Sequence, residues 1–323
     1  MMRYLYVWLI TGAALLASGC SINNGTVRSA LLEKSDGLAV ELADTPFYPQ
    51  STDQCGPAAL ATALRTTGVR VTPVDLAPSL YIPARQGSLQ IELMAATRGF
   101  GRVPYVVEPN VVSLLAELQS GRPVLVLQNL GTSFLPVWHF AVVIGYLPEQ
   151  NRFVLRSGDV RRHLMTVPRF LRSWRRADSW GMVVLMPGEL PSDPDARTFV
   201  RAVADLEAVG QIEAAVAGYR AATEQWPRNA LAWLGLGNAY SELGQLDMAQ
   251  TAYSEVLKIE PDSLVALNNM ALVLADRGYV EDAIRSIDAA LSRTKPGDAL
   301  HGVIAQTRSE ILDDQKDSPR ARP

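Results

Sequence analysis

The stretch that decides the first half of the fold reads Phe47-Tyr48-Pro49-Gln50-Ser51-Thr52-Asp53-Gln54-Cys55-Gly56-Pro57-Ala58-Ala59-Leu60. Small and apolar residues continue at helical spacing to Leu64. Pro57 suits the first turn of a helix, because the N–H that proline lacks is not needed there. The pattern therefore predicts a helix that begins at Cys55. The positive end of a helix dipole favours the thiolate, which is the nucleophilic form of cysteine.

A glutamine just before this cysteine has a chemical use as well. Its side-chain amide can donate a hydrogen bond to an oxyanion that develops during acyl transfer. Gln50 lies five residues before Cys55, and Gln54 adjoins it and is the weaker candidate. The alternative for Cys55 is a small buried side chain with no chemistry, which is the commonest fate of a free cysteine.

A nucleophilic cysteine needs a general base, and the chain has three histidines. His139 opens the apolar stretch Trp138-His139-Phe140-Ala141-Val142-Val143-Ile144-Gly145-Tyr146, which is typical of a strand that ends in a glycine turn. His163 follows two arginines and is expected on a solvated face. His301 falls in the C-terminal helical region. His139 is thus the predicted base, and an interior histidine at a strand edge is the alternative.

The segment Gln-x4-Cys-Gly-Pro-Ala-Ala-Leu resembles the peptidases that trim double-glycine leaders from bacteriocin precursors, and His139-Phe140 resembles the histidine segment of the same family. The resemblance implies a papain-like fold, Cys55 as nucleophile, His139 as base and Gln50 in the oxyanion hole. Members fused to transporters carry this glutamine six residues before the cysteine, so Gln50 is one residue closer. No ATPase motif is present in this chain.

The family also implies an aspartate that orients the histidine, near the end of the next strand. The matching stretch is Val154-Leu155-Arg156-Ser157-Gly158-Asp159. Asp159 is the nearest carboxylate but lies a residue or two late, and Ser157 or Gly158 occupies the aligned position. Either Asp159 acts through a shifted loop, or Cys55 and His139 act as a dyad.

Residues 37–188 are expected to form one α+β, papain-like domain with an antiparallel sheet. Helices are predicted first and strands later, which is typical of this class. The predicted helices begin near Pro73, near Gly87 and at Asn110. The predicted strands cover 102–107, 123–128, 139–146, 152–156 and 180–186. The arginines between 156 and 176 are expected to form a solvated basic face, and contact with lipid headgroups is the alternative.

The N-terminus predicts export. Arg3 precedes an apolar run from Tyr4 to Leu16, which is too short to span a membrane and is typical of a signal peptide. The ending Leu16-Ala17-Ser18-Gly19-Cys20 resembles a lipobox, with Ala17 where leucine is usual. The resemblance implies a lipoprotein signal peptide over residues 1–20, with Cys20 lipidated as the mature N-terminus. Because serine follows Cys20, it also implies an outer-membrane site facing the periplasm. An ordinary signal peptide is the alternative.

Residues 21–36 are polar and are interpreted as a tether, and residues 189–195 as a Pro/Asp-rich linker. From residue 196 the sequence repeats every 34 residues. The segment 230–263 matches the tetratricopeptide pattern at each landmark. The repeats are therefore placed at 196–229, 230–263 and 264–297. A capping helix is expected near 299–313, with the repeat region ending at 314 and a flexible tail at 315–323.

Tetratricopeptide arrays bind peptides or proteins in a concave groove lined by the first helix of each repeat. Self-association or simple stabilisation of the chain is the alternative role. The groove is expected to be apolar and amide-rich rather than basic. Its predicted lining residues are Leu231, Leu234, Asn238, Val265, Asn268 and Leu272.

Composition excludes several function classes. The net charge of −3 over 323 residues is unlike that of a nucleic-acid binder. No cysteine or histidine motif of metal-binding spacing and no glycine-rich phosphate loop is present, so no metal or cofactor is expected. The sequence predicts a membrane-anchored cysteine peptidase with a protein-binding module. A catalytically degenerate scaffold and an amidase or transglutaminase-like enzyme are the alternatives.

Overall fold

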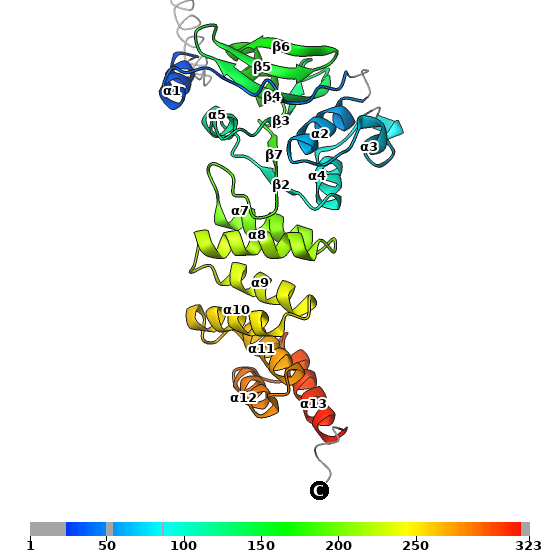
Figure 1. Ribbon diagram of the computed structural model, residues 1–323, viewed down its shortest axis with the longest axis vertical. Helices are drawn as coiled ribbons and strands as arrows, with labels where there is room; N and C mark the ends of the chain where they lie inside the picture. Colours follow the sequence, from blue (N-terminus) through cyan, green and yellow to red (C-terminus); the bar gives the residue numbers. More distant parts are fainter. Residues whose placement is uncertain (1–23, 50–53, 86, 318–323) are drawn as a thin grey trace, which may run out of the picture.

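The computed structural model describes residues 24–49, 54–85 and 87–317 and shows an elongated molecule (Figure 1). A sheet-containing domain occupies one end, and stacked helices extend away from it to the C-terminus. Cys20 and Gln50 lie outside the described residues.

The sheet is antiparallel throughout, as predicted. Its strands run in the order β2-β7-β3-β4-β5-β6, and β1 pairs with β4. Because β7 lies between β2 and β3, the last strand of the domain is central to it. The strands are β1 (Val40–Glu41), β2 (Val103–Val106), β3 (Val124–Asn129), β4 (Trp138–Leu147), β5 (Arg152–Ser157), β6 (Val160–Thr166) and β7 (Gly181–Leu185).

Helices cover both faces of this sheet, because alternate residues of a strand point to opposite sides. On β4, Phe140 and Val142 join a cluster with α2, whereas Ala141 and Val143 join a cluster with α5 and α6. The helices of the domain are α1 (Asn24–Ser35), α2 (Cys55–Thr66), α3 (Pro73–Leu80), α4 (Gln90–Gly99), α5 (Val111–Gln119) and α6 (Val167–Arg175), with a 3-10 turn at Pro83–Arg85.

The structure corrects the interpretation of residues 21–36 as a tether. From Asn24 the chain forms α1, which packs on α5. Leu31 is fully buried, and the Gln119 side chain donates a hydrogen bond to the carbonyl of Lys34 at 2.8 Å. The segment is mostly polar, and its few apolar residues are buried only by contact with α5. The composition of the segment alone therefore suggested that it was solvated.

The basic stretch also contains elements that the sequence analysis did not predict, β6 and α6. Arg156 is buried rather than solvated. Its guanidinium donates to the carbonyls of Thr45, Ala43 and Arg161 at 2.6–3.1 Å. Burial lowers the pKa of Arg156. This side chain ties the segment that leads towards Cys55 to β5, one residue before Ser157.

The repeats fold as predicted, with two antiparallel helices in each. Small residues at the helix crossings admit large neighbours: a Cβ atom on Gly237 would lie 2.5 Å from the ring of Tyr253. The helices are α7 (Ala196–Glu207), α8 (Ile212–Gln225), α9 (Ala230–Glu242), α10 (Leu246–Ile259), α11 (Leu264–Asp276), α12 (Val280–Leu291) and the capping α13 (His301–Asp317).

The predicted linker connects the two parts but is fastened to both. The Ser192 backbone N–H donates to the Glu117 carboxylate at 2.7 Å, and the Asp195 N–H donates to the Tyr105 hydroxyl at 3.2 Å. Beyond it, the ring of Phe199 lies 6.5 Å from that of Tyr105. One apolar core therefore continues from the sheet into the first repeat.

Among the helices formed by the described residues, none has both the length and the apolar character that crossing a bilayer requires.

Candidate functional site

Cys55 is the first residue of α2, as the sequence predicts, and its side chain is buried. Residues 55–64 of this helix are all buried, so α2 is a core helix whose N-terminus carries the thiol. Gly56 is required by the packing. A Cβ atom at this position would lie 2.5 Å from the Ser88 hydroxyl oxygen. The segment before α4 therefore lies directly against the residue next to Cys55.

His139 is the second residue of β4 and pairs across the sheet with Gln128 of β3. Its Nε2 lies 2.8 Å from the Ser157 hydroxyl oxygen. Burial lowers the pKa of His139, and the nearby His163 lowers it further. The neutral imidazole is thus the favoured form at neutral pH, and it is the form that can accept a proton.

The cysteine helix and the histidine strand belong to one packed unit. Helix α2 packs against β4 and also contacts β3, β5 and β7. Cys55 belongs to the same apolar cluster as Phe140, the neighbour of His139. Because Ser157 engages Nε2, any proton transfer by His139 would use Nδ1. This arrangement is typical of a histidine base: one ring nitrogen is hydrogen-bonded to an orienting group, and the other accepts the proton.

Asp159 is exposed in the turn between β5 and β6 and makes no hydrogen bond or ion pair with a described residue. The chain leaves β5 at Ser157 and turns at Gly158, whose φ is +60°. The side chain that bonds His139 is therefore a serine hydroxyl. The sequence leaves open either Asp159 acting through a shifted loop or a dyad of Cys55 and His139. In the structure, His139 bonds Ser157, which occupies the aligned position.

The oxyanion donor predicted from the sequence, Gln50, is not among the described residues. Gln54 is described: it occupies the N-cap position of α2, is exposed and makes no capping hydrogen bond through its side chain. Upstream, the Tyr48 hydroxyl donates to the Val71 carbonyl at 3.1 Å. The segment around Tyr48 is thus held against the rest of the domain.

The residues predicted to line the groove of the repeats differ in how exposed they are. Leu231, Val265 and Leu272 are exposed, whereas Asn268 is buried. Leu231, Leu234 and Asn238 line a groove of about 680 Å³ together with residues of α7 and α8. A second cavity of about 710 Å³ lies between α4, β2 and α7, and it shares Arg197 and Arg201 with the groove.

These two arginines were missed by the sequence analysis. Arg197 and Arg201 are exposed and form no ion pair with described residues. The acidic side chains beside them are already engaged: Asp205 pairs with Arg98, and Glu207 accepts from the Tyr219 hydroxyl at 2.7 Å. Asp195 also lines the groove and interacts with Arg197, so arginines and carboxylates are balanced there. The cavity between α4, β2 and α7 is basic as well as apolar, because three arginines and one aspartate line it.

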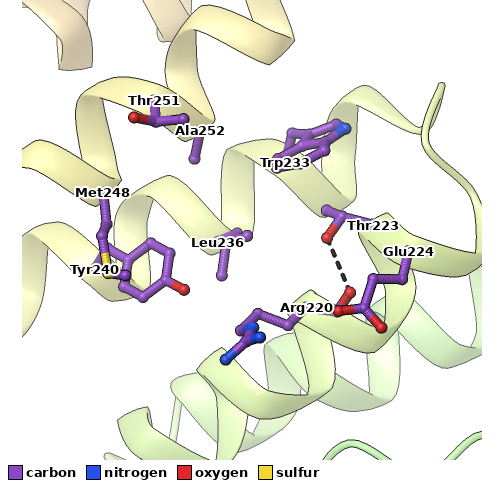
Figure 2. A pocket seen from close by; sticks show the side chains of 9 residues that line it. All are labelled: Arg220, Thr223, Glu224, Trp233, Leu236, Tyr240, Met248, Thr251 and Ala252. Atoms are coloured by element: carbon purple, nitrogen blue, oxygen red, sulfur yellow. Dashed lines mark hydrogen bonds between the residues drawn. The ribbon is translucent and has the colours of Figure 1, made fainter.

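A further pocket of about 360 Å³ lies wholly within the repeats (Figure 2). Figure 2 shows Arg220 and Glu224 of α8 facing Trp233, Leu236 and Tyr240 of α9. The pocket is lined by no cysteine or histidine. It therefore offers no thiol and no imidazole, and the candidate for cysteine chemistry remains the one at Cys55 and His139.

Comparison with known families agrees with this division of the chain. Residues 42–179 match the model of the Peptidase_C39 like family, a range that contains Cys55, His139, Ser157 and Asp159. Residues 230–263 match the tetratricopeptide repeat model, and residues 208–244 match a second TPR repeat model. No curated protein matches the chain.

Solved structures resemble one part of the chain or the other. A putative C39-like peptidase from Bacillus anthracis is 16% identical, with a TM-score of 0.40, over 46% of this chain and 98% of that one. The type III secretion translocator chaperone SycD of Yersinia enterocolitica is 18% identical, with a TM-score of 0.36, over 38% and 90%. The TPR2B domain of yeast Sti1, in its pHsp70 complex, is 16% identical, with a TM-score of 0.34, over 37% and 94%.

The two parts of the molecule thus have separate identities. The family match covers the thiol-bearing helix α2, the histidine strand β4 and strands β2, β3, β5 and β6, whereas β1 and β7 lie outside it. The repeat matches fall on α8, α9 and α10. Residues 42–179 form a peptidase C39-like domain, and tetratricopeptide repeats follow it.

Proposed function

We propose that this protein is a cysteine peptidase in which Cys55 attacks a peptide bond and His139 is the base. The observation that carries the proposal is the packing of α2 on β4, with the thiol at the first residue of the helix and the histidine at the start of the strand. A helix N-terminus favours the thiolate that forms during attack.

The proposed reaction proceeds through an acyl-enzyme. Nδ1 of His139 takes the thiol proton while Sγ of Cys55 bonds to the carbonyl carbon. The C–N bond then breaks, and the leaving amine takes the proton from His139. Water, deprotonated by the same nitrogen, hydrolyses the thioester and restores the thiol. Gln50 and the backbone N–H groups at the start of α2 are the proposed donors to the oxyanion.

Ser157 makes this base different from one held by a carboxylate. A carboxylate fixes the tautomer and stabilises the imidazolium, whereas a hydroxyl can donate or accept and carries no charge. Burial and His163 also disfavour the charged ring of His139. We therefore expect a resting pair of thiol and neutral imidazole, with proton transfer during attack rather than before it.

The repeats are proposed to hold the protein that is cut, or a partner that delivers it. Arg197 and Arg201 line both the groove and the cavity beside α4, with the Asp195 carboxylate near Arg197. Leu89 of that cavity adjoins Ser88, which packs against Gly56. An acidic segment with apolar side chains would fit this path between the repeats and the nucleophile.

Anchoring to the outer membrane through a lipid on Cys20, facing the periplasm, completes the proposal. It is supported by the resemblance of residues 16–20 to a lipobox. Metabolic labelling with a radioactive fatty acid tests it: label should enter the wild-type chain, and Cys20→Ala should remove it. Equal labelling of both would contradict the anchor.

The decisive experiment measures the reactivity of Cys55 with iodoacetamide against pH. A chain that begins at Ser21 keeps every described element and leaves Cys55 as its one cysteine. We expect half-maximal reactivity below about 8.5, the value of a free thiol. His139→Ala should slow the reaction at pH 7 about tenfold or more. Identical profiles of the two proteins would overturn the proposed pairing.

A scaffold that has lost catalysis is the second candidate, favoured by the serine in place of a carboxylate beside His139. The two functions separate when a mixture of unfolded proteins is incubated with the wild-type chain and with Cys55→Ala, and new termini are found by mass spectrometry. Termini produced by the wild-type chain alone support the peptidase. Their absence, together with an unreactive Cys55, supports the scaffold.

A further inference from the structure

The connection between β3 and β4 exposes an unusual number of large apolar side chains. Phe134 is 94% exposed and Leu135 is 78% exposed, so almost nothing in the molecule shields them. We call residues 130–138 the apolar loop. Its exposed large side chains are Leu130, Phe134, Leu135, Val137 and Trp138.

The apolar loop has a defined shape. The buried Asn129 accepts hydrogen bonds from the N–H groups of Gly131 and Val137, both at 3.0 Å, and donates to the Thr132 carbonyl at 3.1 Å. The Leu135 N–H donates to the Thr132 hydroxyl at 3.0 Å. A Cβ atom on Gly131 would lie 2.2 Å from the Leu135 carbonyl oxygen. These contacts hold Phe134 and Leu135 outward.

A cluster of arginines stands beside this loop. Helix α6 packs on β3, and the Gln128 side chain donates to the Ser173 hydroxyl at 2.7 Å. At the end of α6, the guanidinium of Arg176 donates to the Gly131 carbonyl. The exposed arginines of the cluster, which form no ion pair with described residues, are Arg169, Arg172, Arg175 and Arg176.

The arginines also enclose space for an anion. Arg172, Arg175 and Arg176 line a cavity of about 310 Å³ with Pro168 and Leu171. The acidic residue nearest in sequence, Asp178, is exposed and forms no ion pair with them. Guanidinium groups bind phosphate oxygens through pairs of N–H donors, and three such groups converge here.

We infer that the apolar loop and the α6 arginines form one docking surface for an anionic phospholipid membrane. The loop projects outward, so it cannot enclose a peptide, but it can enter the acyl-chain region of a bilayer. Trp138 at its base is a residue type favoured at membrane interfaces, and the arginines lie beside it to meet lipid phosphates. Because β4 begins with Trp138 and His139, docking would bring His139 close to the membrane surface.

Vesicle binding tests the inference without reference to catalysis. The chain beginning at Ser21 is sedimented with vesicles of phosphatidylcholine alone or with phosphatidylglycerol added. We expect binding that requires phosphatidylglycerol and weakens with salt. The double variant Phe134→Ser, Leu135→Ser should lower the partition coefficient on the order of tenfold or more. Arg172→Gln with Arg175→Gln should lower it by about fivefold per charge.

Matched controls use exposed residues away from the surface. Val74→Ser and the pair Arg65→Gln, Arg70→Gln remove apolar area and charge elsewhere and should leave vesicle binding unchanged. Three results of the vesicle assay would overturn the inference: no binding, equal binding to both kinds of vesicle, or unchanged binding of the Phe134→Ser, Leu135→Ser variant.

Concentration-dependent self-association that this double variant abolishes would also overturn it, because a second copy of the chain would then occupy the surface. A last comparison adds inorganic phosphate or chloride at equal ionic strength. If both displace the protein from vesicles to the same extent, the surface binds lipid. If phosphate displaces more protein than chloride does, the surface is a free-phosphate site instead.

Discussion

The C39-like domain and the repeats are built from contacts of opposite range. In the repeats, each helix packs on its neighbours in sequence, and one small–large pairing recurs, as with Gly235 against Tyr219 and Gly237 against Tyr253. In the domain, β7 inserts between β2 and β3, and the proposed nucleophile and base come from separate elements. The comparison teaches that periodicity specifies the repeats locally, whereas the site exists only when the whole sheet has formed.

The two regions nevertheless share a core at their junction. Tyr105 of β2 contacts Phe199 of α7, and Phe199 contacts Trp226 at the end of α8, with ring centroids 6.0 Å apart. Arg98 of α4 pairs with Asp205 of α7. The first repeat therefore packs directly against the domain, and the linker is not the only connection between the two regions.

The largest effect is expected where this shared core is broken. Phe199 is fully buried, so Phe199→Ala should lower the free energy of unfolding by about 3–5 kcal/mol. Urea unfolding is followed by far-ultraviolet circular dichroism, which is dominated by the repeats, and by the change in the alkylation rate of Cys55 from its native value, which reports on the domain. Both transitions should move to lower urea together.

Phe100→Ala is the matched control, because Phe100 is partly exposed and lies outside the shared core. It should shift neither transition by more than about 1 kcal/mol. If Phe199→Ala moves the dichroism transition alone, the two regions unfold independently and the junction does not couple them.

A glycine in the repeats tests the local pairing. A Cβ atom on Gly235 would lie 2.3 Å from the ring of Tyr219, which is buried and cannot retreat. Gly235→Ala should therefore cost about 1–3 kcal/mol through overpacking, despite the better helix propensity of alanine. Gly302→Ala in α13, where a Cβ meets nothing within 4 Å, should instead stabilise the protein by about 0.5–1 kcal/mol. Equal effects of the two substitutions in urea titrations would remove the packing explanation.

At the site, Ser157→Asp should change the charge state of His139. A carboxylate beside Nε2 favours the imidazolium, so the pKa of His139 should rise by about one to three units. Ser157→Ala removes the hydroxyl without adding charge and is the control. The ring titration is measured by nuclear magnetic resonance of the labelled histidine. Similar midpoints for Ser157→Asp and Ser157→Ala would show that residue 157 does not face the ring in solution.

The smallest effect is a dependence of stability on pH. The folded-state pKa of His139 is lowered by burial and that of His163 by burial and Arg169, so the unfolded chain binds protons more tightly at both. Stability is full above about 6.5, the unfolded value, and falls as pH drops below it. Each histidine contributes at most about 1.4 kcal/mol per pH unit.

His139→Gln removes one of these titrations and should flatten the fall in urea midpoint between pH 7 and pH 5. Phe100→Ala, which removes no titrating group, is the control and should leave the wild-type slope. A slope that His139→Gln does not change would mean that the ring is equally easy to protonate in the folded and unfolded chains.

Much of the fold is readable from the sequence because its signals are local. The helical repeats and the antiparallel sheet match the predictions, and Asn110 caps α5 by accepting from Val112 and Ser113 as proposed. Helix α6 was not predicted, although Val167, Phe170, Leu171 and Trp174 have helical spacing, because arginines fill its other positions. Helix α1 was not predicted because its sequence is mostly polar, and its few apolar residues are buried only by packing against α5.

The sequence by itself determined where the nucleophilic helix begins, which histidine opens a strand, and how the helical repeats are spaced. Each of these depends on residues within one or two turns of one another. Only the tertiary structure decided that Ser157, and not Asp159, bonds His139, that Arg156 is buried, and that Phe199 joins the repeats to the domain. These depend on where strands end, how the chain turns after them and which surfaces meet, and no local pattern encodes the distance between side chains on different elements.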